Sequence, residues 1–243
     1  MVAHKDIFSD TEVLRDNIYL IQQFYIDKVK SRYEEIKYCL KRNAELGMFK
    51  KIILLNEKIY SAEELGVSEE VLKTSIEQIN INKRMFFSDI FRNINKLQLK
   101  GYIMFSNSDI FYDNSIQNIF RSFLSLKKIF FALTRYEYKK GENLSNCKMC
   151  EVKRRSQDTW IFHTNISIGQ DIIKKTRFQL GKLRCDTVLA GTFKRQKFIV
   201  TNPVFDIKTY HFHTSEIRNY IKNKEDHVHG RGSVVDLLYR RRR

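Results

Sequence analysis

Three short polar clusters contain the side chains that could perform chemistry. The first is Asn107-Ser108-Asp109, which follows an apolar run and precedes Ile110. A hard divalent cation prefers oxygen ligands, commonly one or two carboxylates together with phosphate oxygens. Asp109 at the end of a strand could provide such a ligand, although Asn, Ser and Asp are also common in simple turns.

The second cluster surrounds Asp158, which lies two residues before Trp160, the only tryptophan of the chain. A carboxylate that is partly desolvated beside an aromatic ring can serve as a general base near neutral pH. The alternative is a carboxylate that caps a turn or pairs with Arg154 or Arg155.

The third cluster contains His211 and His213, which would share one face of a strand. Two imidazoles in that arrangement can ligate a metal or contact phosphate, and one buried histidine beside one exposed histidine is the plainer alternative. Arg218 follows within the next turns and could add positive charge. Together the clusters hold what a nucleoside-diphosphate donor requires: a cation ligand, cationic groups and a carboxylate base.

Strands and helices are expected to alternate over the first 135 residues. Apolar and β-branched runs predict strands, and apolar residues at helical spacing predict helices. The expected strands cover residues 18–26, 51–57, 75–80, 101–109 and 128–135, and the expected helices cover 31–46, 61–72, 86–97 and 116–126. This order predicts βαβ units and a parallel sheet, at whose carboxyl edge Asn56, Glu57 and Asn107–Asp109 would meet.

The second half of the chain is more mixed. Residues 139–155 are polar and basic and predict a loop. Cys147 and Cys150 are expected to be two reduced thiols in it, because no second zinc-ligand pair lies near, and a zinc site is the alternative. The remaining strands are expected over 156–163 and 198–210, and the remaining helices over 170–177 and from Cys185. No repeat or linker divides the chain. We therefore expect an N-terminal extension over 1–17, one domain over 18–221 and a basic tail over 222–243.

The composition restricts the class of protein. The 243 residues include 44 Lys and Arg against 28 Asp and Glu, a formal net charge of +16, which suits anionic partners. An aromatic content of 13% excludes a disordered, tail-like chain. No apolar run approaches the ~18–20 residues that span a bilayer and no secretory signal is evident, so we expect a cytoplasmic protein. Arg240–Arg243 predict peripheral attachment to the inner face of an anionic membrane, with an unattached tail as the alternative.

Five motifs occur in an order that resembles a family of small GT-A-type glycosyltransferases from surface-glycan pathways of bacteria and large DNA viruses. The motifs are Asn107–Ile110, Leu133–Glu137, Ser156–Phe162, Gly181–Asp186 and the pair of Asn202-Pro203 with His211–Arg218. Arg32–Asn43 also resembles the first helix of that family. The similarity spans about residues 18–220.

The resemblance implies a single-domain α/β fold with a Rossmann-like, mostly parallel central sheet flanked by helices. It implies a hexosyltransferase-type enzyme that moves a sugar from a nucleotide-diphosphate sugar, with uridine the expected base, to a hydroxyl of a glycan or lipid-linked acceptor. Mn²⁺ or Mg²⁺ would be held by Asp109, His211 and His213, and Asp158 would be the base of an inverting displacement. The donor or the acceptor would contact Gln22, Asn56, Arg84, Asn107, Ser108, Arg135, Asp186 and Arg218.

Two other functions fit parts of the sequence. Basic charge with aromatic residues is the general footprint of a nucleic-acid-binding protein. No helix-turn-helix, paired zinc ligands or aromatic RNA-binding signature appears, so no nucleic acid is expected as a partner. A metal-dependent nuclease or phosphohydrolase could use Asp109, Asp158, Asp186 and the histidines, and it would cleave phosphodiesters without a sugar acceptor.

Overall fold

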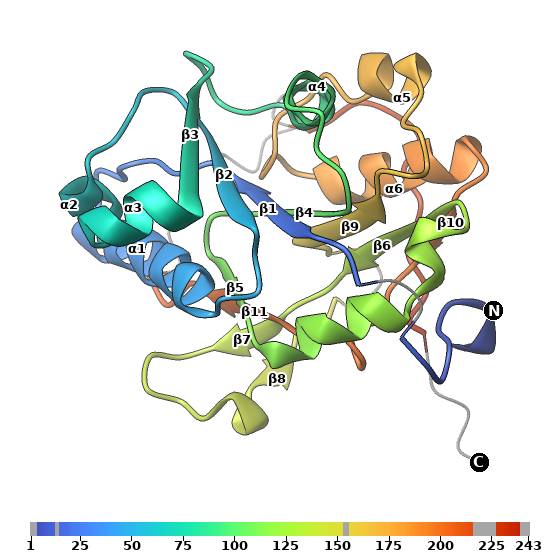
Figure 1. The fold of residues 1–243 in the computed structure, drawn as a ribbon, viewed down its shortest axis with the longest axis horizontal. Helices are drawn as coiled ribbons and strands as arrows, with labels where there is room; N and C mark the ends of the chain where they lie inside the picture. The colour runs from blue at the N-terminus through green and yellow to red at the C-terminus, as the bar shows by residue number, and fades with distance from the viewer. Residues whose placement is uncertain (1–3, 13–14, 153–155, 216–226, 239–243) are drawn as a thin grey trace.

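The computed structural model describes residues 4–12, 15–152, 156–215 and 227–238. Seven strands form a central sheet in the order β10-β6-β9-β4-β1-β2-β3 (Figure 1). They are β1 (Ile18–Gln22), β2 (Lys51–Asn56), β3 (Ile76–Asn80), β4 (Tyr102–Ser106), β6 (Ile129–Leu133), β9 (Thr159–His163) and β10 (Ile199–Thr201). Neighbouring strands are parallel except that β9 runs antiparallel to β4 and β6. The expected single-domain α/β fold with a mostly parallel central sheet is confirmed.

Helices cover both faces of this sheet (Figure 1). The α-helices are α1 (Lys30–Glu45), α2 (Ala62–Leu65), α3 (Glu69–Ser75), α4 (Phe87–Lys96), α5 (Gln170–Lys175) and α6 (Cys185–Arg195). The 3₁₀ helices are η1 (His4–Asp6), η2 (Asn114–Arg121), η3 (Phe123–Ser125) and η4 (Leu144–Asn146). α4, α5 and α6 share one core with Ile53 and Leu55, whereas α1, η2 and η3 share the other with Ile52 and Leu54. Alternate residues of one strand therefore enter two cores, which explains the continuous apolar runs in the sequence.

A second, smaller sheet lies beside the carboxyl edge of the central sheet (Figure 1). It has the order β5-β11-β7-β8, made of β5 (Ile110–Tyr112), β11 (Thr209–Phe212), β7 (Tyr136–Tyr138) and β8 (Lys148–Met149). β5 begins directly after the turn at residues 107–109 that ends β4. β11 pairs antiparallel with β5, with His211 opposite Ile110, so the small sheet carries His211 to the end of β4.

Several predicted elements differ from the structure for local reasons. The predicted strand over 198–210 is wrong: it forms β10 and β11 in different sheets, because the carbonyl of Pro203 accepts hydrogen bonds that close a turn. The predicted helix over 61–72 is two helices, because Gly66 ends α2 at a φ of 71° and Ser68 caps α3. The predicted loop over 139–155 contains η4 and β8, and the predicted helix over 116–126 consists of the 3₁₀ helices η2 and η3.

Part of the basic tail packs against the domain. Residues 227–238, which we call the C-terminal strap, run along α6 and the end of β10. The backbone N–H of Ser233 donates to a carbonyl of α6 at 2.8 Å, and Val235 and Leu238 are fully buried. Arg240–Arg243 and the predicted site residue Arg218 lie outside the described residues. None of the helices in the described part of the chain is long and apolar enough to cross a membrane.

Candidate active site

A cleft of about 1310 Å³ lies beyond the carboxyl ends of β1, β2 and β4. In open α/β sheets this edge is where ligands bind. Its walls come from the segments that follow those strands, from the small sheet, from residues 180–187 and from the strap. The charged and polar side chains that line it include Arg32, Arg84, Asn107, Ser108, Asp109, Arg135, Asp158, Asp186, His211 and His213. The fold thus brings the three clusters of the sequence to one place.

Asp109, His211 and His213 form a compact cluster in this cleft. One ligand atom from each residue lies within 4.8 Å of the others. Asp109 Oδ2 lies 3.2 Å from His211 Nε2 and 4.0 Å from His213 Nδ1. Asp109 Oδ1 and His213 Nε2 are buried and have no hydrogen-bond partner. An oxygen and a nitrogen that are buried without a partner are what a divalent cation would satisfy, and two imidazoles beside one carboxylate suit Mn²⁺ better than Mg²⁺, which prefers oxygen ligands.

The charges of this cluster are strongly coupled. Burial opposes ionisation of Asp109, but His211 and Arg32 hold its pKa well below the usual range. Burial likewise opposes protonation of His211, but Asp109 and Glu137 raise its pKa to about 9. Burial and the charge of Arg32 lower the pKa of His213, which is therefore neutral at pH 7 and has a lone pair for a cation.

Asp158 also lines the cleft and is held by two donors. Arg135 Nη1 donates to its Oδ2 at 2.6 Å, and Asn107 Nδ2 donates to its Oδ1 at 2.7 Å. The alternative pairing with Arg154 or Arg155 concerns residues outside the described part of the chain. The amide of Asn107 therefore contacts a second carboxylate. An acid at position 107 would repel Asp158, so the amide is what this pair of neighbours requires.

Asp186 lies near Asp158, at the N-terminal end of α6. Its oxygens accept backbone N–H groups, from Thr187 at 2.8 Å and from Gln157 at 3.3 Å. Burial raises the pKa of Asp186 to about 6, and the charge of Asp158 adds to the rise. Asp186 is thus a carboxylate whose proton affinity is tuned towards neutral pH, the property expected of a general base.

The other predicted site residues divide into two groups. Arg84 and Ser108 line the cleft, and Arg84 Nη2 donates to the carbonyl of Leu180 at 3.3 Å. Gln22 and Asn56 are buried beneath the cleft and do not line it. The Gln22 amide donates to Ser106 Oγ at 2.9 Å, and Asn56 Oδ1 accepts the backbone N–H of Phe24 at 2.8 Å. These two amides hold the strand ends in place rather than facing a ligand.

The sequence does not predict three residues of the site. Arg32 and Glu35 in α1 and Glu137 in β7 surround the Asp109 cluster. The resemblance of residues 32–43 to a family helix marks that segment but assigns no role to Arg32. Arg32 and Glu35 pair with each other at helical spacing. The partners of these three residues in the site, Asp109, Ser215 and His211, are distant in sequence, so no local spacing connects them.

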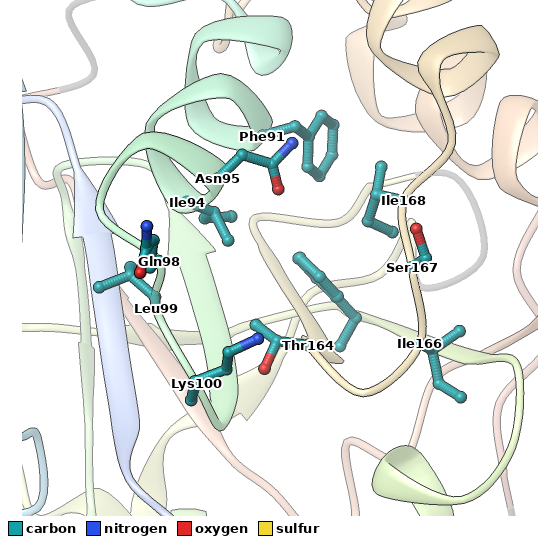
Figure 2. Close-up of a pocket in the computed structure, with 11 residues that line it drawn as sticks. Phe91, Ile94, Asn95, Gln98, Leu99, Lys100, Thr164, Ile166, Ser167 and Ile168 are labelled. Atoms are coloured by element: carbon teal, nitrogen blue, oxygen red, sulfur yellow. The ribbon is translucent and has the colours of Figure 1, made fainter.

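A smaller pocket of about 260 Å³ lies at the opposite edge of the central sheet, between the end of α4 and residues 164–168 (Figure 2). Ile94, Leu99 and Ile166 line it, and Lys100 is its charged neighbour. No carboxylate or histidine of the described residues lines this pocket. The groups suited to acid–base or metal chemistry therefore gather in the larger cleft.

No protein-family model and no curated protein matches this sequence. Among solved structures, the chain is similar to the mannosyltransferase PcManGT from Pyrobaculum calidifontis, in complex with GDP-Man and Mn²⁺, with a TM-score of 0.55 and 7% identity over 88% of this chain and 61% of that chain. It is also similar to TarS 1–349 from S. aureus, in complex with UDP-GlcNAc, with a TM-score of 0.50 and 12% identity over 85% of this chain and 62% of that chain. This chain spans about three fifths of the length of either. The similarity confirms the expected GT-A-type fold.

Proposed function

We propose that this protein is a glycosyltransferase that moves the sugar of a nucleoside-diphosphate sugar to a hydroxyl group of a glycan or lipid-linked acceptor. The observation that carries the proposal is the convergence of the Asp109–His211–His213 cluster with Asp158 and Asp186 in one cleft of a GT-A fold. The two similar structures, in complex with GDP-Man and UDP-GlcNAc, support the class of donor. Uridine remains the expected base of the nucleotide.

The donor end of the cleft consists of Arg32, Asp109, His211 and His213. A divalent cation held by Asp109 and the histidines would stabilise negative charge on the departing diphosphate. Arg32 is a cation of the chain itself and can donate charge-assisted hydrogen bonds to phosphate oxygens. Arg84 lines the same cleft and adds a further guanidinium. This concentration of positive charge suits a diphosphate leaving group.

The acceptor end consists of Asp158, Asp186, the N-terminal end of α6 and the strap. We assign the general base to Asp186, whereas the sequence points to Asp158. Both oxygens of Asp158 already accept hydrogen bonds from charged or amide side chains, so it is suited to orient a sugar or acceptor hydroxyl. Asp186 instead accepts from the backbone N–H groups of Thr187 and Gln157, and its raised pKa favours proton uptake near neutral pH.

The reaction we propose is a single displacement at the anomeric carbon. The acceptor oxygen forms the new glycosidic bond, the bond from the anomeric carbon to the diphosphate oxygen breaks, and the acceptor proton passes to Asp186. A general base of this kind contributes typically ~10²–10⁴-fold to the rate. A single displacement without an enzyme nucleophile inverts the configuration of the sugar, which nuclear magnetic resonance of the product can determine.

Calorimetry with a panel of uridine and guanosine diphosphate sugars, in Mn²⁺, Mg²⁺ or chelator, tests the proposed function. We expect at least one of these donors to bind, and Mn²⁺ to tighten the binding. His213→Gln should remove most of the Mn²⁺-dependent part, because it deletes a ligand whose lone pair is unpartnered. If no nucleotide sugar binds and the protein instead hydrolyses bis(p-nitrophenyl) phosphate, the metal-dependent phosphohydrolase replaces this proposal.

The cytoplasmic location and the attachment of Arg240–Arg243 to an anionic membrane stay predictions from the sequence. Sedimentation with vesicles that contain anionic lipid tests the attachment. Removal of residues 239–243 should reduce the bound fraction, since each arginine near such a surface contributes about 1 kcal/mol. Equal sedimentation of both chains would reject the attachment.

A further inference from the structure

Arg32 is buried against the carboxylate that fits a cation. Its Nη2 donates to Asp109 Oδ2 at 2.5 Å, and its Nη1 donates to Glu35 Oε2 at 3.1 Å. Its side chain is only 7% exposed, and it lines the cleft. Asp109 Oδ2 also faces His211 Nε2, at 3.2 Å. One buried carboxylate is therefore already neutralised by positive charge from the protein.

Glu35 holds Arg32 from the side away from Asp109. Besides Arg32, its carboxylate accepts hydrogen bonds from Thr214 Oγ1 at 3.0 Å, from the Ser215 N–H at 2.7 Å and from Ser215 Oγ at 2.8 Å. Thr214 and Ser215 directly follow His213. A single buried carboxylate thus fixes both the guanidinium and the segment that carries a cation ligand.

We infer that Arg32 is a resident counter-ion that competes with a divalent cation for Asp109, and that it keeps the affinity for the cation low until a diphosphate is present. Two positive charges beside one buried carboxylate repel each other strongly, because the surroundings screen them less than water does. A diphosphate supplies negative charge that both can share, and a guanidinium is well suited to bind two of its oxygens at once. Each ligand then raises the affinity for the other.

The identity of the anion rests on the proposed function, but the competition itself does not. Arg32, Asp109 and the two histidines are neighbours whatever the donor is, so a titration with the metal alone measures the effect. A purely structural Arg32 predicts the opposite result, since its loss would loosen the site and weaken cation binding. The sign of one measured change therefore separates the two roles.

The test is a Mn²⁺ titration of the free full-length protein, followed by electron paramagnetic resonance of the unbound ion. Arg32→Gln should bind Mn²⁺ at least about tenfold more tightly than the wild type. Lys37→Gln is the matched control, because Lys37 lies on the same helix, pairs with Glu34 at 2.8 Å and contacts neither Asp109 nor Glu35. It removes the same charge and should change the affinity less than about twofold.

Loss of the negative charge of Glu35 should shift the Mn²⁺ affinity in the opposite direction. Glu35→Gln keeps one oxygen that can accept from Thr214 Oγ1 and the Ser215 N–H, but its amide nitrogen cannot accept from Arg32, which is left with Asp109 as its carboxylate partner. Mn²⁺ should then bind more weakly than to the wild type, whereas the control Glu34→Gln should leave the Mn²⁺ affinity nearly unchanged. Arg32→Lys keeps the positive charge without the two-pronged guanidinium, and its Mn²⁺ affinity should lie between those of the wild type and Arg32→Gln.

The nucleotide half of the inference uses uridine and guanosine diphosphate as probes in calorimetry with chelator present. Arg32→Gln should lose at least about tenfold in affinity for whichever diphosphate the wild type binds, and Arg32→Lys should recover part of it. An Arg32→Gln protein that melts near the wild-type temperature but binds Mn²⁺ equally or more weakly overturns the inference. If that variant does not fold, Arg32→Lys decides in the same way. A wild type that binds neither diphosphate overturns the proposed function and leaves the Mn²⁺ result intact.

Discussion

The donor end and the acceptor end of the cleft both bury carboxylates, yet their charges are arranged in opposite ways. At the donor end, Arg32 and His211 hold the pKa of Asp109 well below its usual range, against the effect of burial. At the acceptor end, burial dominates and raises the pKa of Asp186 to about 6, and the neighbouring Asp158 adds to the rise. Burial alone therefore does not decide whether a carboxylate is charged; the number of cations beside it does.

This difference gives the two ends different chemical capacities. A carboxylate that stays ionised at every working pH is a permanent ligand for cations, as the donor end requires. A carboxylate with a raised pKa can take up and release a proton, as the acceptor end requires. Asp158 belongs to the acceptor end in position but resembles the donor end in its pairing with Arg135.

The largest effect is expected when the carboxylate of Asp186 at the acceptor end is removed. Asp186→Asn should lower the rate of sugar transfer by about 10²–10⁴-fold with little change in donor affinity, because it removes the proton acceptor and leaves the donor end untouched. Asp158→Asn should lower the rate less. Steady-state kinetics with the donor found by calorimetry provides the measurement, and Asp171→Asn, an exposed change in α5, is the control. If Asp158→Asn loses sugar transfer while Asp186→Asn stays active, Asp158 is the general base.

The two ends should also respond to substitution with opposite changes in stability. At pH 7, Asp109→Asn should lower the free energy of unfolding by about 3 kcal/mol, because it leaves Arg32 buried without one partner. Asp186→Asn should raise it by about 1–2 kcal/mol, because an ionised carboxylate is removed from a partly buried position. Urea denaturation followed by circular dichroism gives both values.

The pH dependence supplies the control for this pair. The folded-state pKa of Asp186, about 6, lies above its ordinary value of 3.8, so its contribution to stability is complete below about pH 4 and is lost as the pH rises through 6. Asp109 has a lowered pKa, so its contribution is present above about pH 4 and is lost as the pH falls. If Asp186→Asn follows the wild-type profile between pH 4 and 7, Asp186 titrates normally and the contrast fails.

A smaller effect is expected from Glu137, which contacts the cation ligand His211 at the donor end. Glu137 Oε2 lies 2.7 Å from His211 Nδ1, so Glu137 orients the ring that faces Asp109. Glu137→Gln should weaken Mn²⁺ binding by about 10-fold, at the lower end of the range for such outer partners, because the glutamate is half exposed. Calorimetric titration with Mn²⁺ measures it, and Glu45→Gln at the exposed end of α1 should leave the affinity unchanged. Equal affinities for all three proteins would mean that His211 does not ligate the ion.

The parts of the site that follow from the sequence are those with a local cause. An apolar run that ends in polar residues predicts a buried strand and its exposed carboxyl end, which places Asp109 at the rim of the sheet. Alternation of strands and helices then predicts which strand ends lie together. The same reasoning predicts that Gln22 and Asn56 contact a ligand, but neither lines the cleft. Amides at strand ends can bind neighbouring segments of the protein instead of a ligand.

The parts that the sequence does not predict depend on long-range pairing. Arg32 meets Asp109 across 77 positions, and Glu35 meets Ser215 across 180 positions. His211 reaches Asp109 only because β11 pairs with β5 in one particular register. No spacing rule along the chain encodes these contacts. They follow from the second sheet, whose strands are too short to stand out in the sequence.

The smallest effect should come from the strap, which lines the cleft at the acceptor end with Gly232, Ser233 and Val234. Gly191 lies inside α6, and a Cβ atom there would lie 2.3 Å from the carbonyl oxygen of Arg231 in the strap. Gly191→Ala therefore forces the strap to shift, at a cost of about 1–3 kcal/mol. The better helix propensity of alanine, about 1 kcal/mol, offsets part of that cost.

We expect a net loss on the order of 1 kcal/mol in the free energy of unfolding of Gly191→Ala, with unchanged Mn²⁺ affinity. Gly169→Ala is the matched control, because a Cβ at that position meets no atom within 4 Å. Urea denaturation and Mn²⁺ titration of the two alanine variants measure both quantities. A fall in Mn²⁺ affinity for Gly191→Ala alone would show that the strap also supports the donor end, and the two ends would then not be independent.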